Sequence, residues 1–382
     1  MQLKFNAKIL SAALDSVSVG GGDGFTLLVN PVKQNYGDKE VQMAYLTSSD
    51  GTKTAMASVF VKVEGLWEVA TYYPAASFRA AVSSLAKVSD SIMISPKGAY
   101  FEVSDEKEQA VVKVELKENA KGLQLPSTNE GAVLVKMKKD DFLNAIRFGA
   151  YSATESTVAN TDDVSFKVDV ENKRLKVLSK RNVVMSKAES PVEDVQNNAT
   201  SDEWYLVNYK FVQDLATKLK GDMVQIAFAP KFMVVQTATA LFGAKRSEGT
   251  ITAPLEKMLD NKAFDFSGKM EKKDFLLGTE VAMIAVKEKI LSLETLENGT
   301  LLVSSEGNKA VVSQKEHEGQ LPKKYFSIDV LKLALNGCGD TIHYFGEIKT
   351  PFIMFDGEEN GVKYASMIAP ISKKSEEQKK KD

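Results

Sequence analysis

The sequence is poor in the residues that disulfides and many catalytic sites need. It has one cysteine, Cys338, and two histidines, His317 and His343, in 382 residues. A single cysteine excludes an intramolecular disulfide and the small secreted folds that depend on one, so we expect a reducing cytoplasmic location. No apolar run approaches the length that spans a bilayer, and Met1–Leu10 lacks the regions of a signal peptide. We therefore expect no membrane partner.

Candidates for catalysis and for metal binding are equally scarce. His343 lies in an alternating strand pattern and His317 in a charged loop, and neither has an evident Cys, Asp or Ser partner. Cys338 follows Gly337 at a predicted helix end, where the helix dipole does not activate a thiol. Gly20-Gly21-Gly22 lacks the following Lys-Ser or Lys-Thr of a phosphate-binding loop, and no cluster has the spacing of metal ligands. We expect no enzyme activity and no cofactor.

Charge of either sign is not in excess. The chain has 49 basic and 51 acidic side chains, a formal net charge of -2. A protein that coats nucleic acid is usually basic overall, so either nucleic acid is not a partner or the basic residues gather on one surface. Hydrophobic residues make up 43% of the chain, and this length predicts two or three domains. The last segment, residues 373–382, has no apolar residue, and we predict a disordered charged tail there.

A pattern of secondary structure repeats three times, with a period of roughly 120 to 135 residues. Each repeat begins with a helix whose apolar residues recur at helical spacing. We predict these first helices at Asn6–Val17, Lys139–Ala150 and Lys272–Lys287. A second helix, introduced by an aromatic extended stretch, is predicted within Tyr72–Lys87, Trp204–Lys220 and Tyr325–Gly337.

Local signals place the ends of these helices and the strands that follow them. Pro74 suits a first helical turn, Asn208 and Ser327 suit N-caps, and Gly337 suits a stop. Two alternating strands then follow in each repeat, beginning near Ser89, Gly221 and Gly339. The repeat predicts an α+β fold of three domains, each with two helices packed on antiparallel sheets. Polar stretches between the repeats place the domains at residues 1–125, 130–256 and 262–372.

Three segments strengthen a resemblance to a known family. Ile290-Leu291-Ser292 followed by residues 299–304, the strand pattern Tyr364–Ile371, and the turn region Leu175–Met185 match positions of the bacterial DNA polymerase III beta subunit, the DNA sliding clamp. The resemblance extends over nearly the whole chain up to Ile371. The turn at residues 179–184 and the terminal strand depart from the family pattern, so the chain resembles a divergent member.

The resemblance implies a function and a mechanism. Clamps of this family are non-catalytic accessory subunits of a DNA polymerase holoenzyme, in which two three-domain chains close head to tail into a ring around duplex DNA. The ring serves as a processivity factor, and its inner wall attracts phosphates weakly and without sequence preference. The basic residues on or beside the predicted helices are then the DNA-facing candidates: Lys8, Arg79, Lys87, Lys138, Lys139, Arg147, Lys210, Lys218, Lys220, Lys272, Lys273, Lys287 and Lys332. Acidic residues are expected outside the helices, at sites such as Glu358-Glu359.

The resemblance also implies two protein interfaces. Family clamps bind the polymerase, the clamp loader and repair proteins through short apolar-aromatic peptides, in a groove between the second and third domains. The matching positions are Ser179, Arg181, Val183, Val184, Pro254, Met258, Leu259, Met367, Ile368, Ala369 and Pro370. The homodimer joins edge strands of the first and third domains, and the matching seam residues are Ala110, Val112, Val114, Ile290 and Leu291.

Plainer interpretations compete with these assignments. Any one of the lysines also fits the solvated face of an amphipathic helix, and Val183, Val184 and Met367 also fit core packing. An alternative function is a clamp-like interaction protein that keeps the fold and the groove but does not encircle DNA. An unrelated α+β enzyme is a remote third class.

Overall fold

The structure, a computed structural model, describes residues 2–21, 24–36, 39–65, 69–117, 133–153, 163–181, 183–197, 203–248 and 254–371. The predicted tail therefore lies outside the described residues. The chain divides into two compact units, described separately below. Unit 1 comprises Met1–Lys139, Val195–Thr200 and Gln213–Arg246, and unit 2 comprises Asp140–Asp194, Ser201–Val212 and Ser247–Asp382.

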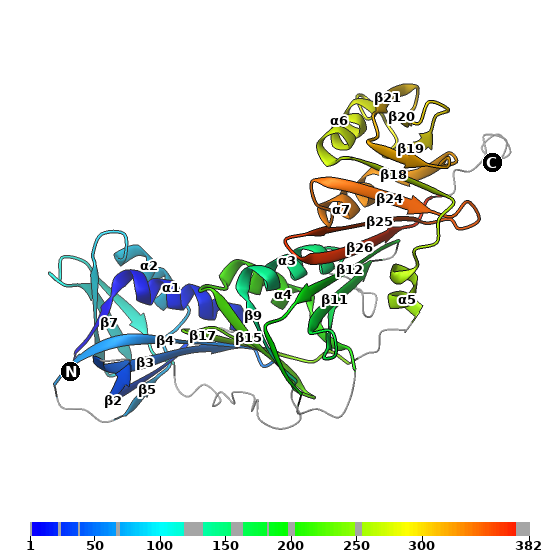
Figure 1. Cartoon of the computed structure of the whole chain (residues 1–382). Coiled ribbons are helices and arrows are strands. Elements are labelled where there is room, and N and C mark those ends of the chain that lie inside the picture. The colour runs from blue at the N-terminus through cyan, green and yellow to red at the C-terminus, as the bar shows by residue number, and fades with distance from the viewer. Residues whose placement is uncertain are drawn as a thin grey trace. The chain divides into compact units, whose positions relative to one another are not determined.

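The helices lie where the repeat predicts them (Figure 1). The three first helices are α1 (Ala7–Val17), α3 (Lys139–Gly149) and α6 (Lys272–Ala282). The three second helices are α2 (Ser77–Leu85), α4 (Tyr209–Lys218) and α7 (Ile328–Asn336). Between the second and third repeats lies α5 (Pro254–Asp260), which the repeat does not predict.

The helix ends confirm some of the local predictions and correct others. Asn6 caps α1, because its side chain accepts a hydrogen bond of 3.1 Å from the Ile9 amide. Pro74 is not in the first turn of α2, which begins at Ser77; it forms an isolated bridge with Leu116 instead. The third first helix ends at Ala282, five residues before the predicted Lys287.

Unit 1 contains one antiparallel sheet of 13 strands. Its main order is β13-β9-β15-β16-β17-β4-β1-β6-β7-β8, with β2, β3 and β5 off this path. The bounds are β1 Gln2–Asn6, β2 Thr26–Tyr36, β3 Lys39–Ser49, β4 Lys53–Glu64, β5 Ala70–Tyr72, β6 Ser91–Lys97, β7 Tyr100–Asp105, β8 Val111–Glu115, β9 Val133–Lys138, β13 Asp194–Asn197, β15 Met223–Phe228, β16 Phe232–Gln236 and β17 Ala240–Lys245. The predicted strand pairs β6–β7 and β15–β16 are present.

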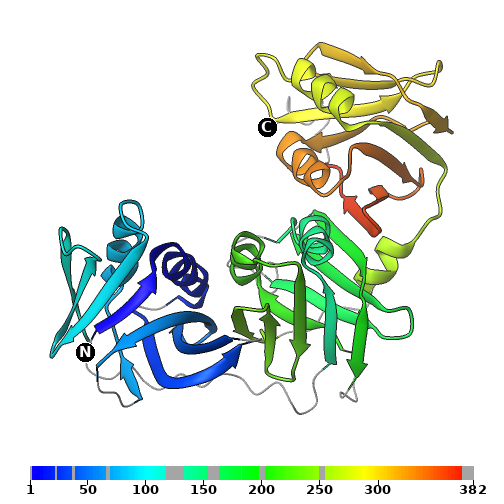
Figure 2. The ribbon, with the colours of Figure 1, turned by 60° about the vertical axis from the view of Figure 1, so that its left-hand side comes forward.

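Unit 2 contains a nine-stranded sheet in the order β14-β10-β11-β12-β26-β25-β24-β18-β22 and a four-stranded sheet in the order β21-β20-β19-β23. The bounds are β10 Asp163–Asp169, β11 Arg174–Arg181, β12 Val184–Pro191, β14 Tyr205–Asn208, β18 Phe266–Glu271, β19 Ile290–Thr295, β20 Leu301–Ser305, β21 Asn308–Val312, β22 Glu316–Glu318, β23 Lys324–Ser327, β24 Thr341–Gly346, β25 Ile353–Glu359 and β26 Val362–Ile368. Figure 2 shows α6, coloured yellow, lying against the four-stranded sheet.

Strands from successive repeats pair with one another inside each unit. In unit 1, β17 of the second repeat pairs with β4 of the first, with Ala240 opposite Ala57. In unit 2, β12 of the second repeat pairs with β26 of the third, with Val184 opposite Ile368. Sheets that continue from one repeat to the next bury their apolar face without a free edge at the junction. The three domain boundaries remain a prediction.

Candidate functional site

The basic residues expected to face DNA fall into three groups in the structure. Seven are exposed on helices or at their ends: Lys8, Lys87, Lys138, Lys220, Lys273, Lys287 and Lys332. Lys139 and Lys210 make further interactions within the protein. The remaining four, Arg79, Arg147, Lys218 and Lys272, have identified internal partners. The helices therefore carry a basic surface, part of which is already neutralised.

Two of these internal partnerships lie in unit 2. Arg147 on α3 lies 3.3 Å from the Glu359 carboxylate and 4.8 Å above the ring of Phe148. Lys272 donates a 2.8 Å hydrogen bond to the carbonyl of Cys338, and burial lowers the pKa of its ammonium group. Lys272 thus anchors the start of α6 to the end of α7.

The thiol of Cys338 is unreactive because the side chain is almost completely buried. Burial raises the pKa of its thiol from 9.0 to about 12. At neutral pH the thiolate fraction is therefore roughly a thousandfold lower than for an exposed cysteine. We expect no measurable reaction with Ellman's reagent at pH 8 in the native protein, and complete reaction after unfolding in guanidinium. Rapid labelling of the native protein at pH 8 would contradict this burial.

Edge strands lie at the ends of two sheets. In unit 1, β8 is the last strand of the sheet, and Val111 and Val112 on it are exposed whereas Val114 is buried. In unit 2, β21 is the last strand of the four-stranded sheet, and its Val311 is 58% exposed. Such strands present unpaired backbone groups to a neighbouring chain.

Ile290 and Leu291 were expected in an edge strand, and this prediction is wrong. They lie in β19, which pairs with β20 on one side and β23 on the other. Their backbone hydrogen bonds are used inside the sheet, and Leu291 is buried in the core. The edge in this part of the chain is β21, two strands away.

Helix α6 adds an exposed apolar surface beside that edge. Leu277, Val281 and Ile284, at helical spacing, are 60%, 40% and 64% exposed. The buried face of this helix carries Phe275, Gly278 and Ala282 instead. α6 packs on β21 and β20, against the face that carries Ala310 and Val312, so Val311 points to the opposite face of β21. The exposed stripe of α6 and the edge strand β21 are together called the α6–β21 surface here.

A mostly buried apolar cluster lies on one face of the nine-stranded sheet. Across adjacent strands, Phe345 lies opposite Met354, Met354 opposite Met367, and Met367 opposite Met185. Leu178 and Leu259 complete the buried cluster, and partly buried Met185, Trp204, Met258 and Phe352 pack against it. We call this set the methionine cluster. Ion pairs hold α5 over it: Lys176 lies 3.1 Å from Glu256, and Lys187 pairs with Asp260.

Several expected groove residues lie on the opposite face of that sheet. Val184 and Ile368 belong to the main core of unit 2. Ser179 is also buried there, where its hydroxyl donates a 2.8 Å hydrogen bond to the Gly149 carbonyl. Alternation along a strand separates them from Met185 and Met367.

The remaining expected groove residues lie near the methionine cluster or at the strand ends. Met258, Leu259 and Met367 belong to the cluster or pack on it. Val183 is exposed, and its carbonyl accepts a 2.9 Å hydrogen bond from the Ala369 amide. Arg181 is exposed at the end of β11, Pro370 is partly buried after β26, and Pro254 begins α5. The residues that the pattern missed, Met185, Trp204, Phe345, Phe352 and Met354, share only their apolar character and are not adjacent in sequence.

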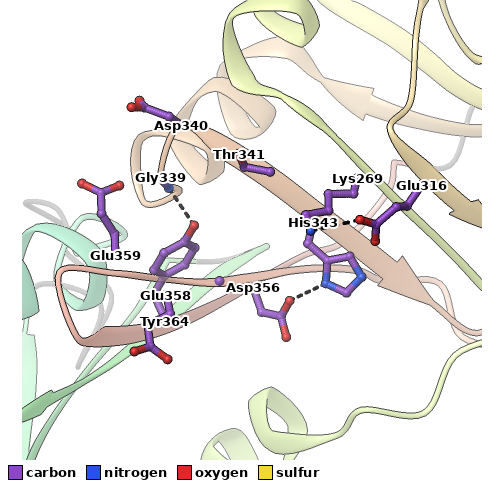
Figure 3. Close-up of a pocket in the computed structure, with 11 residues that line it drawn as sticks. Lys269, Glu316, Gly339, Asp340, Thr341, His343, Asp356, Glu358, Glu359 and Tyr364 are labelled. Atoms are coloured by element: carbon purple, nitrogen blue, oxygen red, sulfur yellow. Dashed lines mark hydrogen bonds and ion pairs between the residues drawn. The ribbon is translucent and has the colours of Figure 1, made fainter.

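A charged cluster borders the methionine cluster in an open hollow (Figure 3). The His343 Nδ1 lies 2.6 Å from Asp356, which also pairs with Lys262. Burial opposes ionisation of Asp356, but these two partners outweigh it and hold its pKa below the ordinary value. Lys262 Nζ lies 5.3 Å above the ring of Phe345, so the charged cluster contacts the methionine cluster. The expectation that His343 has no acidic partner is therefore wrong.

Two further features of the described residues bear on function. No group of three or more His, Cys, Asp or Glu side chains among them is placed to hold a metal ion. None of the helices that can be described has both the length and the apolar character needed to cross a membrane.

Solved structures similar to this one cover the chain from end to end. The beta subunit from the DNA polymerase of Streptococcus pyogenes matches with a TM-score of 0.80 and 14% identity, over 98% of this chain and 100% of that chain. The DNA polymerase sliding clamp from Bacillus subtilis matches with a TM-score of 0.79 and 14% identity, over 98% and 100%. The Helicobacter pylori beta clamp bound to a DNA ligase peptide matches with a TM-score of 0.78 and 14% identity, over 97% and 100%.

No protein-family model matches the sequence, and no curated protein matches it. The likeness is therefore one of fold, at an identity too low for sequence comparison to register. The chain has the fold of the bacterial DNA polymerase III beta subunits, as the resemblance predicted, and the α+β prediction is confirmed.

Proposed function

We propose that the chain is a DNA sliding clamp, a non-catalytic ring of two copies that encircles duplex DNA and tethers a polymerase and other partners. One observation carries the proposal: the chain matches clamp structures over 98% of its length and all of theirs. The chain therefore has the whole fold of a clamp, although the sequences differ at most positions.

The helices are the proposed DNA-facing surface. Exposed lysines such as Lys8, Lys220, Lys273 and Lys332 lie on or beside four different helices, so positive charge is distributed and not concentrated in one patch. Lysine is a flexible point charge, and scattered lysines attract phosphates without fixing a register on the duplex. A ring held in this way stays on DNA and still moves along it.

The proposed dimer seam joins β8 of one copy to the α6–β21 surface of the other. Val111 and Val112 supply exposed apolar side chains on one edge, and Val311 and Leu277 supply them on the other surface. Pairing the two edges satisfies their unpaired backbone groups and buries the valines. Two head-to-tail seams of this kind close a ring and leave neither edge free.

The methionine cluster is the proposed partner groove. Methionine is unbranched and polarisable, so a surface rich in it adapts to different apolar ligands. The clamp of Helicobacter pylori has been solved with a DNA ligase peptide bound. We infer that short apolar-aromatic peptides of a polymerase or a loader bind over Met185, Met258 and Trp204.

Retention on circular DNA tests the proposal. After loading by a clamp loader, the protein should stay on a closed circular duplex through gel filtration and be lost when a restriction enzyme linearises the circle. In the absence of DNA it should sediment at twice the mass of one chain at micromolar concentration. A protein that sediments as a single chain, or that stays equally on linear and circular DNA, would instead be a clamp-like protein that does not encircle DNA.

A further inference from the structure

An acidic side chain lies among the basic residues of unit 1. Asp15 is on α1, Arg79 on α2 and Lys218 on α4. One Asp15 oxygen lies 2.6 Å from Lys218 Nζ, and the other accepts a hydrogen bond from the Arg79 guanidinium. Three helices from distant parts of the sequence thus meet at one carboxylate.

The carboxylate is charged when it makes these contacts. Partial burial opposes its ionisation, but the hydrogen bonds and charges of Lys218 and Arg79 outweigh burial and lower its pKa. Both cations are also partly enclosed, with side chains 24% exposed for Lys218 and 42% for Arg79. The pairs are therefore less screened than pairs between fully exposed side chains.

We propose that Asp15 is a built-in counterion that occupies Arg79 and Lys218 and so weakens the hold of this surface on DNA. The proposal rests on the proposed function, since it concerns how tightly a clamp binds the duplex it surrounds. It assigns Asp15 a tuning role, because the residue would act on DNA only through its two basic partners.

A cation that is already paired within the protein contributes less to DNA affinity than a free one. A lysine that binds a phosphate releases mobile counterions from the DNA, and this release drives binding at low salt. Lys218 and Arg79 must first separate from Asp15, which is covalently fixed and stays behind as a negative charge near the phosphates. Binding of Lys218 or Arg79 to a phosphate therefore adds little affinity for DNA. Exposed Lys8 or Lys220 binds a phosphate without first breaking an ion pair. A weak hold suits a ring that must slide.

The test compares Asp15→Asn with a matched control. Glu64→Gln removes the same charge in the same unit, but Glu64 pairs with Lys62 on strand β4, at 3.0 Å, and not with a helix cation. Binding to a fluorescent linear duplex is measured by anisotropy across a salt titration. We expect D15N to bind about tenfold more tightly at low salt, with a salt slope steeper by up to about two. E64Q should match the wild type.

A second pair of variants separates a tuning role from a change in folding. Lys218→Gln should weaken wild-type binding less than twofold, while Lys220→Gln should weaken it several-fold. The double variant D15N/K218Q should lose about half of the gain seen in D15N, and thermal unfolding should show that all four variants are folded. If the wild type binds duplex and D15N binds no more tightly, Asp15 has no such role, although the clamp function stands. If the wild type is not retained on a closed circular duplex after loading by a clamp loader, the proposed function fails, whatever the result with the linear duplex.

Discussion

The double variant Leu277→Asp/Val311→Asp should exist as a single chain at micromolar concentration and should lose its retention on circular DNA. Both side chains are well exposed in one chain, at 60% and 58%, so the substitutions should cost little in folding. In the proposed ring they are buried at the seam, where each new carboxylate has no partner. An unpaired charge buried at an interface costs about 2–5 kcal/mol. With a loss of roughly 3 kcal/mol at each of two seams, the dimer should weaken by a factor of about 10⁴.

Sedimentation velocity measures this outcome, and Ile348→Asp is its control. Ile348 is 59% exposed in the same unit, between β24 and β25 of the other sheet, so I348D makes the same chemical change away from the α6–β21 surface. It should remain dimeric. A dimer that survives L277D/V311D unchanged would show that the copies do not join through this surface.

Features set by local sequence were predictable. Helical spacing located all six repeated helices, and Gly337 was correctly predicted as the residue that ends α7. These signals depend on residues within a turn or two of each other, where propensity and capping act directly. The α+β class followed from their order along the chain, and the clamp-like arrangement followed from the resemblance to the beta subunit family.

Features set by pairing between distant segments were not predictable. Whether β19 or β21 forms a sheet edge depends on how four strands pair, which the strand pattern of Ile290-Leu291 does not contain. The groove depends on which face of a strand meets α5, and a shift of one residue exchanges Val184 for Met185. The period of α6 identifies an amphipathic helix, but both its faces carry apolar residues, so periodicity did not show which one is buried.

The pairing of Asp15 with Lys218 is likewise invisible in sequence, where 203 residues separate them. A count of lysines on helices treats each as available to DNA. The structure shows that two of the expected basic residues, Lys218 and Arg79, pair with Asp15.

The substitution Met258→Glu should abolish the binding of short apolar-aromatic peptides while leaving the dimer intact. Met258 is partly buried on α5 beside the methionine cluster, with Glu256 and Asp260 on the same short helix. The nearby cations Lys176, Lys187 and Lys262 already pair with Glu256, Asp260 and Asp356, so a bound peptide would bury a poorly compensated charge. That burial costs about 2–4 kcal/mol, which lowers affinity by roughly 30-fold to 1,000-fold.

Fluorescence anisotropy with labelled peptides containing leucine and phenylalanine measures the effect. Met258→Leu is the matched control, because it keeps an apolar side chain of similar volume and should bind within about threefold of the wild type. Val170→Glu, at an exposed position after β10 in the same unit, controls for added negative charge. Peptide binding that survives M258E at full strength would place the groove elsewhere on the chain. Loss in M258E with retention in both controls would assign partner binding to the methionine cluster, even though the sequence placed Ser179, Val184 and Ile368, which lie on the opposite face of the sheet, in the groove.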